Sequence, residues 1–309
     1  MRHGIVLPVP ESPVKGMGWL RDYPSIRDFT PDSDAERERG GRRVAPPTEL
    51  LAKTDAPKAA KAPPAGPIDL RPWCSPIEDQ GKLSSCTAFA GMGMVEYYQR
   101  RAFGKHIDGS HRFLYKATRK LGGFEGDFGA FLRTAIGAMA LFGVPPSHIW
   151  PYDVAKFDEE PPAFCYAFAQ NYQALTYYRL DPPGTAPDAL VNQIKGHLAS
   201  QLPSMFGFTC FDSLDAAFET GGIPFPRSNE EVTGGHAVVA VGYDNAKKIK
   251  NPNGGPETTG AFRIRNSWGR PWGEDGYGWL PYRYVQEGLA DDWWVLLKNE
   301  WVDTQQFKT

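Results

Sequence analysis

Apolar residues in the first half of the chain's body recur at helical spacing. Within residues 86–100, one helical face carries Phe89, Met92 and Val95. This period predicts a helix that ends before Gly104. The same spacing predicts two further helices, over 131–141 and 188–199.

The pattern changes to that of strands in the second half. β-branched and aromatic residues dominate five stretches, which are 203–211, 236–244, 261–268, 277–285 and 292–299. A stretch rich in Asn, Gly and Pro over 251–260 is typical of a turn joining two of these strands. Helices followed by antiparallel strands predict an α+β protein with two lobes.

Residues 1–67 differ from this body, which starts near Ile68 and runs to 309. The stretch 16–29 contains four large apolar side chains that are able to dock on a surface, namely Trp19, Tyr23, Ile26 and Phe29. From residue 30 to 67 the chain is rich in charge, proline and alanine. Such a composition buries too little apolar area to offset the entropy of ordering, so we expect a linker there.

Composition narrows the class of protein. The chain has 309 residues, 41% of them hydrophobic, and a net charge of −2. This charge gives no electrostatic reason to expect nucleic acid or a membrane as a partner. No apolar run approaches the roughly 18–20 residues that span a bilayer. The short, proline-broken N-terminus does not resemble a signal peptide, so we expect a cytoplasmic protein, with signal-independent export left open.

The four cysteines are widely spaced and form no C-x-x-C pair. They are Cys74, Cys86, Cys165 and Cys210. We expect free thiols in a reducing compartment.

Cys86 stands at the start of the first predicted helix. Ser84 and Ser85 before it are residue types that cap helices. Free backbone N–H groups and the helix dipole favour an anion in the first turn, which lowers the pKa of a thiol there. Gly91 and Gly93 weaken the helix and indicate that it packs closely against its neighbours.

Two later residues complete a catalytic pattern. His236 begins the predicted strand 236–244, and Asn266 ends the next strand, followed by Trp268. A base and an orienting amide on adjacent strands are able to face a helix N-terminus across a cleft. Nucleophile, base and orienter are the groups that thiol catalysis requires.

At this point the sequence resembles the papain family of cysteine peptidases. The matching motifs are DQGKLSSC with Gln80 and Cys86, GGHAVVAVGY with His236, and NSWG with Asn266 and Trp268. The resemblance covers roughly residues 68–300. It implies a papain-like fold with a helical lobe over about 75–170 and an antiparallel, barrel-like β lobe over about 171–300.

The resemblance also implies the role of each residue in thiol-dependent hydrolysis of peptide bonds, as in a cysteine endopeptidase. Cys86 would attack the carbonyl as an ion pair with His236, and Asn266 would orient the imidazole under the cover of Trp268. The side-chain amide of Gln80 and the backbone N–H of Cys86 would form the oxyanion hole. The partner is then a peptide or protein substrate, and no cofactor is implied.

The chain departs from the family pattern at several positions. Leu83 replaces a cysteine, which removes a disulfide, and Thr87 replaces a tryptophan. Gly126 and Asp127 stand where a glycine pair binds the substrate backbone. Gly235, after Gly234, stands where side chains line the specificity pocket, so we expect a roomier pocket.

The N-terminal extension has no long helical pro-domain signature. We expect residues 16–29 to pack on the body and 30–67 to pass near the cleft and restrict access, as in a zymogen. The alternative is a free tail without a regulatory role.

Two other functions remain open at this level. One is a catalytically silent papain-like module that binds peptides or a protein, which the presence of all four polar catalytic residues disfavours. The other keeps the acyl-enzyme but acts as an acyl transferase, amidase or exopeptidase.

The remaining histidines, His111 among them, stand alone without metal-ligand spacing, so no metal site is predicted. Trp293 and Trp294 are expected in the core.

Overall fold

The computed structural model describes residues 15–25, 28, 30, 38–39, 42–43, 63–172 and 174–299. Every structural statement below concerns these residues. Two of the apolar residues predicted to dock, Ile26 and Phe29, lie outside them, as does most of the predicted linker. The linker residues that are described include the two short strands β1 (Glu38–Arg39) and β2 (Arg42–Arg43), which pair with each other.

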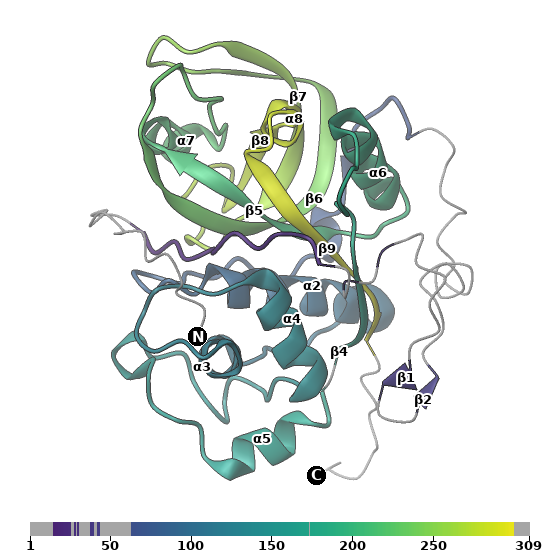
Figure 1. Cartoon of the computed structure of the whole chain (residues 1–309), viewed down its shortest axis with the longest axis vertical. Coiled ribbons are helices and arrows are strands. Elements are labelled where there is room, and N and C mark those ends of the chain that lie inside the picture. Colours follow the sequence, from purple (N-terminus) through teal and green to yellow (C-terminus); the bar gives the residue numbers. More distant parts are fainter. Residues whose placement is uncertain are drawn as a thin grey trace.

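Helices make up one lobe, in the lower half of Figure 1. Its elements are α2 (Cys86–Phe103), α3 (His111–Gly122), α4 (Leu132–Leu141), the 3-10 turn η2 (Val154–Lys156) and α5 (Ala163–Ala169). The predictions for α2 and α4 are confirmed. Helix α2 ends where Gly104 adopts the left-handed conformation, with φ of 71°.

Helix α3 was not predicted, because its buried face mixes apolar and charged residues. Arg112 and Arg119 are buried beside Phe113 and Leu114, so the apolar period is interrupted. A local signal starts the helix, since the Ser110 side chain accepts a hydrogen bond from the Phe113 N–H.

An antiparallel sheet forms the other lobe. Its order is β4 (Ala174–Arg179), β9 (Ala290–Asn299), β5 (Ser204–Phe211), β6 (Val232–Lys250), β7 (Glu257–Arg265) and β8 (Tyr277–Pro281). The short β3 (Ile68–Asp69) pairs with β6 and is followed by the 3-10 turn η1 (Arg71–Trp73). Figure 1 shows the sheet curling into a barrel-like body with α6 (Pro187–Ala199) at its side. The remaining short elements are η3 (Asp212–Ala216), α7 (Ala217–Thr220) and α8 (Tyr282–Gln286).

The predicted strands and the third helix are present, with two differences. The stretch 277–285 divides at Pro281, after which the chain turns into α8. Strand β4 was not predicted. It lies at one end of the sheet order and pairs with β9 alone.

Helix α2 packs on the sheet and joins the two lobes. A Cβ added to Gly93 would lie 3.1 Å from Arg265 Nε on β7, and one added to Gly91 would lie 3.0 Å from Met139 Cε on α4. The close packing expected from these glycines is therefore confirmed. Trp293 and Trp294 are fully buried, as predicted, and Trp293 stacks on Phe206 at 3.8 Å between ring centres.

Figure 1 shows the described N-terminal stretch, in purple, passing between the sheet and the helices.

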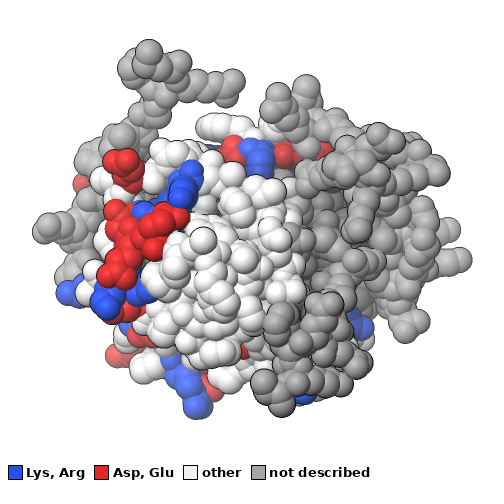
Figure 2. Space-filling view, turned by 90° about the horizontal axis from the view of Figure 1, so that it is seen from below, with Lys and Arg blue, Asp and Glu red and all other residues white. Residues whose placement is uncertain are grey.

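Figure 2 views the molecule from the side of the helical lobe and shows acidic and basic atoms side by side along one edge. In this lobe Lys116 pairs with Asp158 and Lys120 with Glu160. Among the described helices, none combines the length and the apolar character that crossing a membrane would need.

Candidate active site

Cys86 is the first residue of α2 and lies at the boundary between the lobes. Its side chain is completely buried, and the sulfur accepts a hydrogen bond from the Ala237 N–H on β6 at 3.3 Å. Ser85 is the N-cap residue, but its hydroxyl pairs with the Tyr152 hydroxyl at 2.8 Å and does not cap the helix. The sulfur therefore contacts Ala237, the residue that follows His236 in the sequence.

His236 and Asn266 meet across β6 and the end of β7. His236 Nε2 lies 2.8 Å from Asn266 Oδ1, and the Trp268 indole stacks on the imidazole with ring centres 4.3 Å apart. His236 Nδ1 is buried without a hydrogen-bond partner. The amide and the indole hold the ring in one orientation and leave its second nitrogen for another group, as expected for a base beside a nucleophile.

Gln80 is fixed from both ends of its side-chain amide. Oε1 accepts a hydrogen bond from the Ser267 hydroxyl at 2.5 Å, while Nε2 donates to the Leu83 carbonyl at 2.8 Å and to the Gly16 carbonyl at 2.9 Å. The predicted oxyanion donor therefore already binds a carbonyl oxygen, and that oxygen belongs to the chain itself.

The N-terminal segment, residues 15–25, occupies the cleft. Besides Gln80, the Trp268 indole N–H donates to the Gly16 carbonyl at 3.0 Å, and Lys15 forms an ion pair with Asp79 at 2.7 Å. A Cβ on Gly16 would lie 2.1 Å from the Leu83 carbonyl oxygen, so the backbone approaches closely only because this residue is glycine.

Beyond Gly16, the segment pairs with the backbone of both lobes. The N–H groups of Gly18 and Trp19 point to the Gly235 carbonyl at 3.0 Å, which belongs to the β lobe. The Ala130 N–H donates to the Gly18 carbonyl at 2.8 Å, and the Leu20 N–H donates to the Ala130 carbonyl at 3.0 Å. This pattern makes Trp19 and Ala130 a parallel β-bridge.

Charged side chains hold the end of the segment. Arg133 on α4 binds Asp22, the Tyr23 carbonyl and Asp28, while Arg21 pairs with Asp291. We expected residues 16–29 to dock on the body and 30–67 to approach the cleft. The described residues of the first stretch do bind the body, and Gly16 contacts Gln80 directly, whereas most of 30–67 lies outside the described residues.

Gly126 and Asp127 have other contacts than the substrate contacts predicted for them. The Asp127 carboxylate accepts hydrogen bonds from the Ser84 N–H at 2.9 Å and the Tyr115 hydroxyl at 2.7 Å. The Gly126 carbonyl binds Arg119. Ala130, four residues after Gly126, pairs with the chain in the cleft, and no sequence signal distinguished it. Gly235, predicted to line the specificity pocket, contacts Gly18 and Trp19 of the N-terminal segment.

Burial controls the protonation of the two reactive groups in this closed arrangement. Desolvation raises the pKa of the Cys86 thiol to about 12, and hydrogen bonds such as that from Ala237 oppose it only in part. Desolvation also lowers the pKa of His236 to about 4, although its hydrogen bond to Asn266 acts in the other direction. Burial therefore disfavours the charged form of each group in this closed arrangement.

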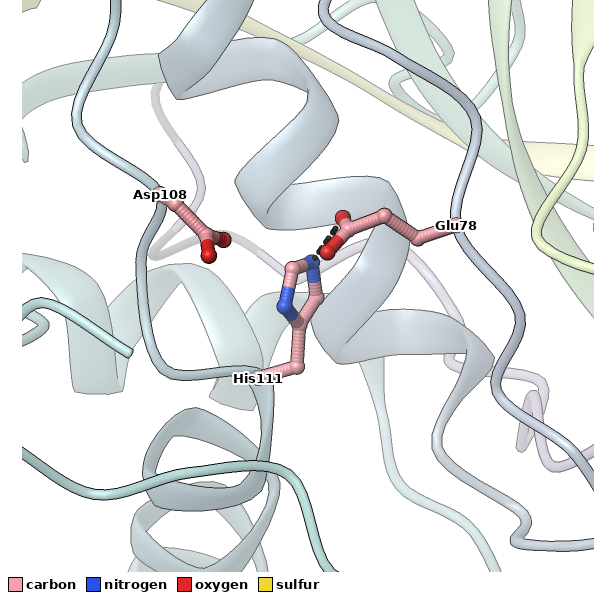
Figure 3. Close-up of side chains that lie close together, drawn as sticks. All are labelled: Glu78, Asp108 and His111. Carbon is pink, nitrogen blue, oxygen red and sulfur yellow. Dashed lines mark ion pairs between the residues drawn. The ribbon is translucent and has the colours of Figure 1, made fainter. Parts of the chain in front are cut away.

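His111 stands alone in the sequence, but in the fold it is a buried histidine with acidic neighbours. Its Nε2 lies 3.0 Å from Glu78 Oε2, and Asp108 lies on the other side of the ring (Figure 3), with one ligand atom of each of the three groups within 4.8 Å of the others. Burial lowers the pKa of His111, but the Glu78 carboxylate outweighs this and leaves the pKa above its ordinary value. The ring also stacks on Phe89 of α2 at 4.0 Å. The ion pair joins the loop that leads to Gln80 to α3, and the stacking on Phe89 joins it to α2, the helix that carries Cys86.

All four cysteines are free and buried, as the sequence predicted. Cys74, Cys165 and Cys210 each have a thiol whose pKa is raised by burial. Of the four, Cys86 alone adjoins a histidine held by an asparagine.

Comparisons with known proteins agree with this geometry. A family model described as "Papain family cysteine protease" matches residues 67–301. An uncharacterized peptidase C1-like protein of Acanthamoeba polyphaga mimivirus is 36% identical over 228 residues, which are 71% of this chain and 68% of that protein. Chymopapain of Carica papaya is 27% identical over 66% of this chain, a match that spans half of the plant protein.

Among solved structures, Xylellain, a cysteine protease from Xylella fastidiosa, superposes with a TM-score of 0.70 at 30% identity. The superposition covers 95% of this chain and 98% of that one, so the likeness extends beyond the catalytic body. The fold is the two-lobed papain-like α+β fold. The chain belongs to the papain family of cysteine proteases and is a thiol-dependent peptidase.

Proposed function

We propose that this peptidase is an endopeptidase that cleaves peptide bonds through an acyl-enzyme on Cys86. The observation that carries the proposal is the arrangement at His236, whose ring is held by Asn266 at 2.8 Å and covered by Trp268. Its Nδ1 has no hydrogen-bond partner, and the next residue, Ala237, binds the sulfur of Cys86. Readmission of water to the open cleft removes the desolvation that keeps both groups neutral. The proton then passes from Cys86 to His236, and the ion pair forms.

In the reaction the Cys86 thiolate adds to the substrate carbonyl carbon, and the oxygen takes up negative charge. Gln80 Nε2 and the Cys86 N–H stabilise this oxyanion. Collapse of the intermediate breaks the C–N bond as His236 gives its proton to the leaving amine. Water, deprotonated by His236, then releases the acid from the sulfur.

We also propose that the N-terminal segment restrains the enzyme. The Gly16 carbonyl takes the hydrogen bond of Gln80 that an oxyanion would need, and residues 18–20 use the backbone groups of Ala130 and Gly235. A substrate meets all these groups only after the segment leaves.

The catalytic proposal is tested with an unselective peptide mixture and the full chain carrying Gly18→Ala, a substitution that disfavours the bound segment because its Cβ would lie 2.1 Å from the Ser84 carbonyl oxygen. We expect Cys86→Ser to abolish cleavage and Asn266→Ala to reduce it by about a hundredfold, since the imidazole loses its orientation. Cys210→Ser, which alters another fully buried thiol, is the matched control and should keep activity. Equal activity of the Cys86 and Cys210 variants would contradict the proposal.

A further inference from the structure

The side chain of Trp19 fills a pocket that two glycines create. Trp19 is only 6% exposed. A Cβ on Gly207 of β5 would lie 1.9 Å from Cε2 of the indole, and a Cβ on Gly235 would lie 2.9 Å from Cε3. Neither glycine has a positive φ, so backbone conformation does not require it. The two positions lack side chains because an indole-sized group needs the space.

This pocket opens beside the reacting groups. Trp19 projects from the stretch of backbone that hydrogen-bonds with Ala130 and Gly235, and Gly235 directly precedes His236. Any peptide that replaces the segment on these backbone groups would therefore present one side chain to the same pocket.

A single polar atom at the pocket wall is paired with the indole. The Trp19 N–H donates to Asp292 Oδ2 at 3.1 Å, and Asp292 is fully buried. The other carboxylate oxygen, Oδ1, accepts from the Trp294 indole at 2.7 Å and lies 3.1 Å from Arg179. Loss of Trp19 would remove the donor from Oδ2 and leave a buried acceptor unsatisfied, which is unfavourable.

Asp292 shares its buried counterion with other carboxylates. Arg179 lies 3.1 Å from Asp292 and also pairs with Asp181 at 2.9 Å, while Asp28 lies 3.9 Å from the guanidinium. The neighbouring Asp291 pairs with Arg21 of the segment. A lysine or arginine side chain would lose its hydration on entering this buried pocket, and only a close contact with Asp292 would offset that cost. A neutral N–H donor avoids the desolvation of a full charge.

We infer that this pocket selects an aromatic side chain with an N–H donor, which among the common residues means tryptophan. The inference rests on the proposed peptidase function and names its substrate class, namely peptides with Trp at the residue held between Ala130 and Gly235. Selectivity arises from two sources, the volume left by Gly207 and Gly235 and the acceptor Asp292 Oδ2. A side chain with the shape of tryptophan but without an N–H separates the two contributions to selectivity, because it fills the volume and cannot donate to Asp292.

The experiment uses the full chain with Gly18→Ala and Trp19→Ala, two substitutions chosen to displace the segment. Faster alkylation of Cys86 than in the unaltered chain verifies that the cleft is open. Peptides of one scaffold carry Trp, 3-benzothienylalanine, Leu or Arg at the tested residue. We expect kcat/KM to be about tenfold higher for Trp than for its benzothienyl isostere, since the isostere leaves Asp292 unpaired. Adding Gly207→Ala should lower the value for Trp peptides about tenfold, whereas the matched Gly196→Ala, whose Cβ meets nothing within 4 Å, should not.

Cleavage without preference for Trp over the isostere would overturn the inference and leave the peptidase intact. If no peptide is cleaved, the proposed function fails. The inference is then decided by equilibrium binding of the same peptides to the open chain with Cys86→Ala, where we expect the Trp peptide to bind about tenfold more tightly than its benzothienyl isostere.

A second measurement needs no open cleft. Trp19→Phe in the otherwise unchanged chain should speed alkylation of Cys86, with the exposed Tyr23→Phe as control, and an unchanged rate would also overturn the inference.

Discussion

At the scale of residues, burial and hydrogen bonding act in opposite directions on the catalytic groups. Cys86 and His236 are both completely buried, and each forms a hydrogen bond that favours its charged form: the Cys86 sulfur accepts from the Ala237 N–H, and His236 Nε2 donates to Asn266 Oδ1. Desolvation is the larger effect on both pKa values, so burial favours the uncharged form of each group.

His236 should therefore weaken the fold in acid. Its pKa is about 4 in the folded chain against 6.5 when free, so between these values the unfolded chain binds more protons. The free energy of unfolding should fall as the pH drops from 6.5 to 4, by roughly 3 kcal/mol from this group. Urea unfolding of the chain and of His236→Gln, which does not titrate, isolates that contribution. Parallel pH profiles for the two chains would contradict it.

At the scale of elements, the position of Gln80, the proposed oxyanion donor, depends on how the loop around it is attached to α2. The Tyr152 hydroxyl donates to the Gln80 carbonyl at 2.9 Å and also pairs with Ser85, the N-cap of α2. Phe89 of the same helix packs between the Tyr152 edge and the His111 ring, and His111 pairs with Glu78. These contacts fix Gln80 relative to the Cys86 N–H, the other proposed oxyanion donor.

Tyr152→Phe should lower kcat about tenfold with little change in KM. The substitution keeps the aromatic packing but removes both hydrogen bonds, so Gln80 is placed less precisely while substrate contacts remain. A full oxyanion donor is worth 10²- to 10³-fold, and imprecise placement costs part of that. Steady-state kinetics on an opened chain measures the effect, with Tyr166→Phe, which loses a bond to Glu160 at the surface, as control. An effect confined to KM would argue against a positioning role.

At the scale of the whole molecule, the segment connects the lobes across the cleft. It pairs with Ala130 and Arg133 in the helical lobe and with Gly235, Asp291 and Asp292 in the β lobe. Release of the segment, as proposed above, would break contacts to both lobes together.

Gly18→Ala should release this restraint. The added Cβ would lie 2.1 Å from the Ser84 carbonyl oxygen, and φ of Gly18 is 142°, which side chains disfavour. A penalty of about 1–3 kcal/mol on the closed state raises peptidase turnover about tenfold or more. Gly66→Ala, whose Cβ meets nothing within 4 Å, is the matched control in the same N-terminal region. Unchanged turnover in Gly18→Ala would show that the segment does not limit access.

Most of the architecture followed from local patterns. Helical spacing indicated α2, α4 and α6, and the strand-rich second half predicted the sheet, because apolar periodicity reflects one buried face. Helix α3 and strand β4 escaped this reasoning. Buried arginines of α3 are tolerated only through tertiary partners such as the Trp150 ring over Arg112 and Asp158 beside Arg119.

The sequence by itself determined the reactive groups. Cys86, His236, Asn266 and Gln80 were identified from residue type, motif and order, because thiol chemistry needs those functional groups whatever surrounds them. Only the tertiary structure decided what covers them and in which protonation state they rest. Those properties depend on burial and on contacts between residues far apart in the chain, such as Gly16 with Gln80 and Trp19 with Asp292, which no local pattern encodes.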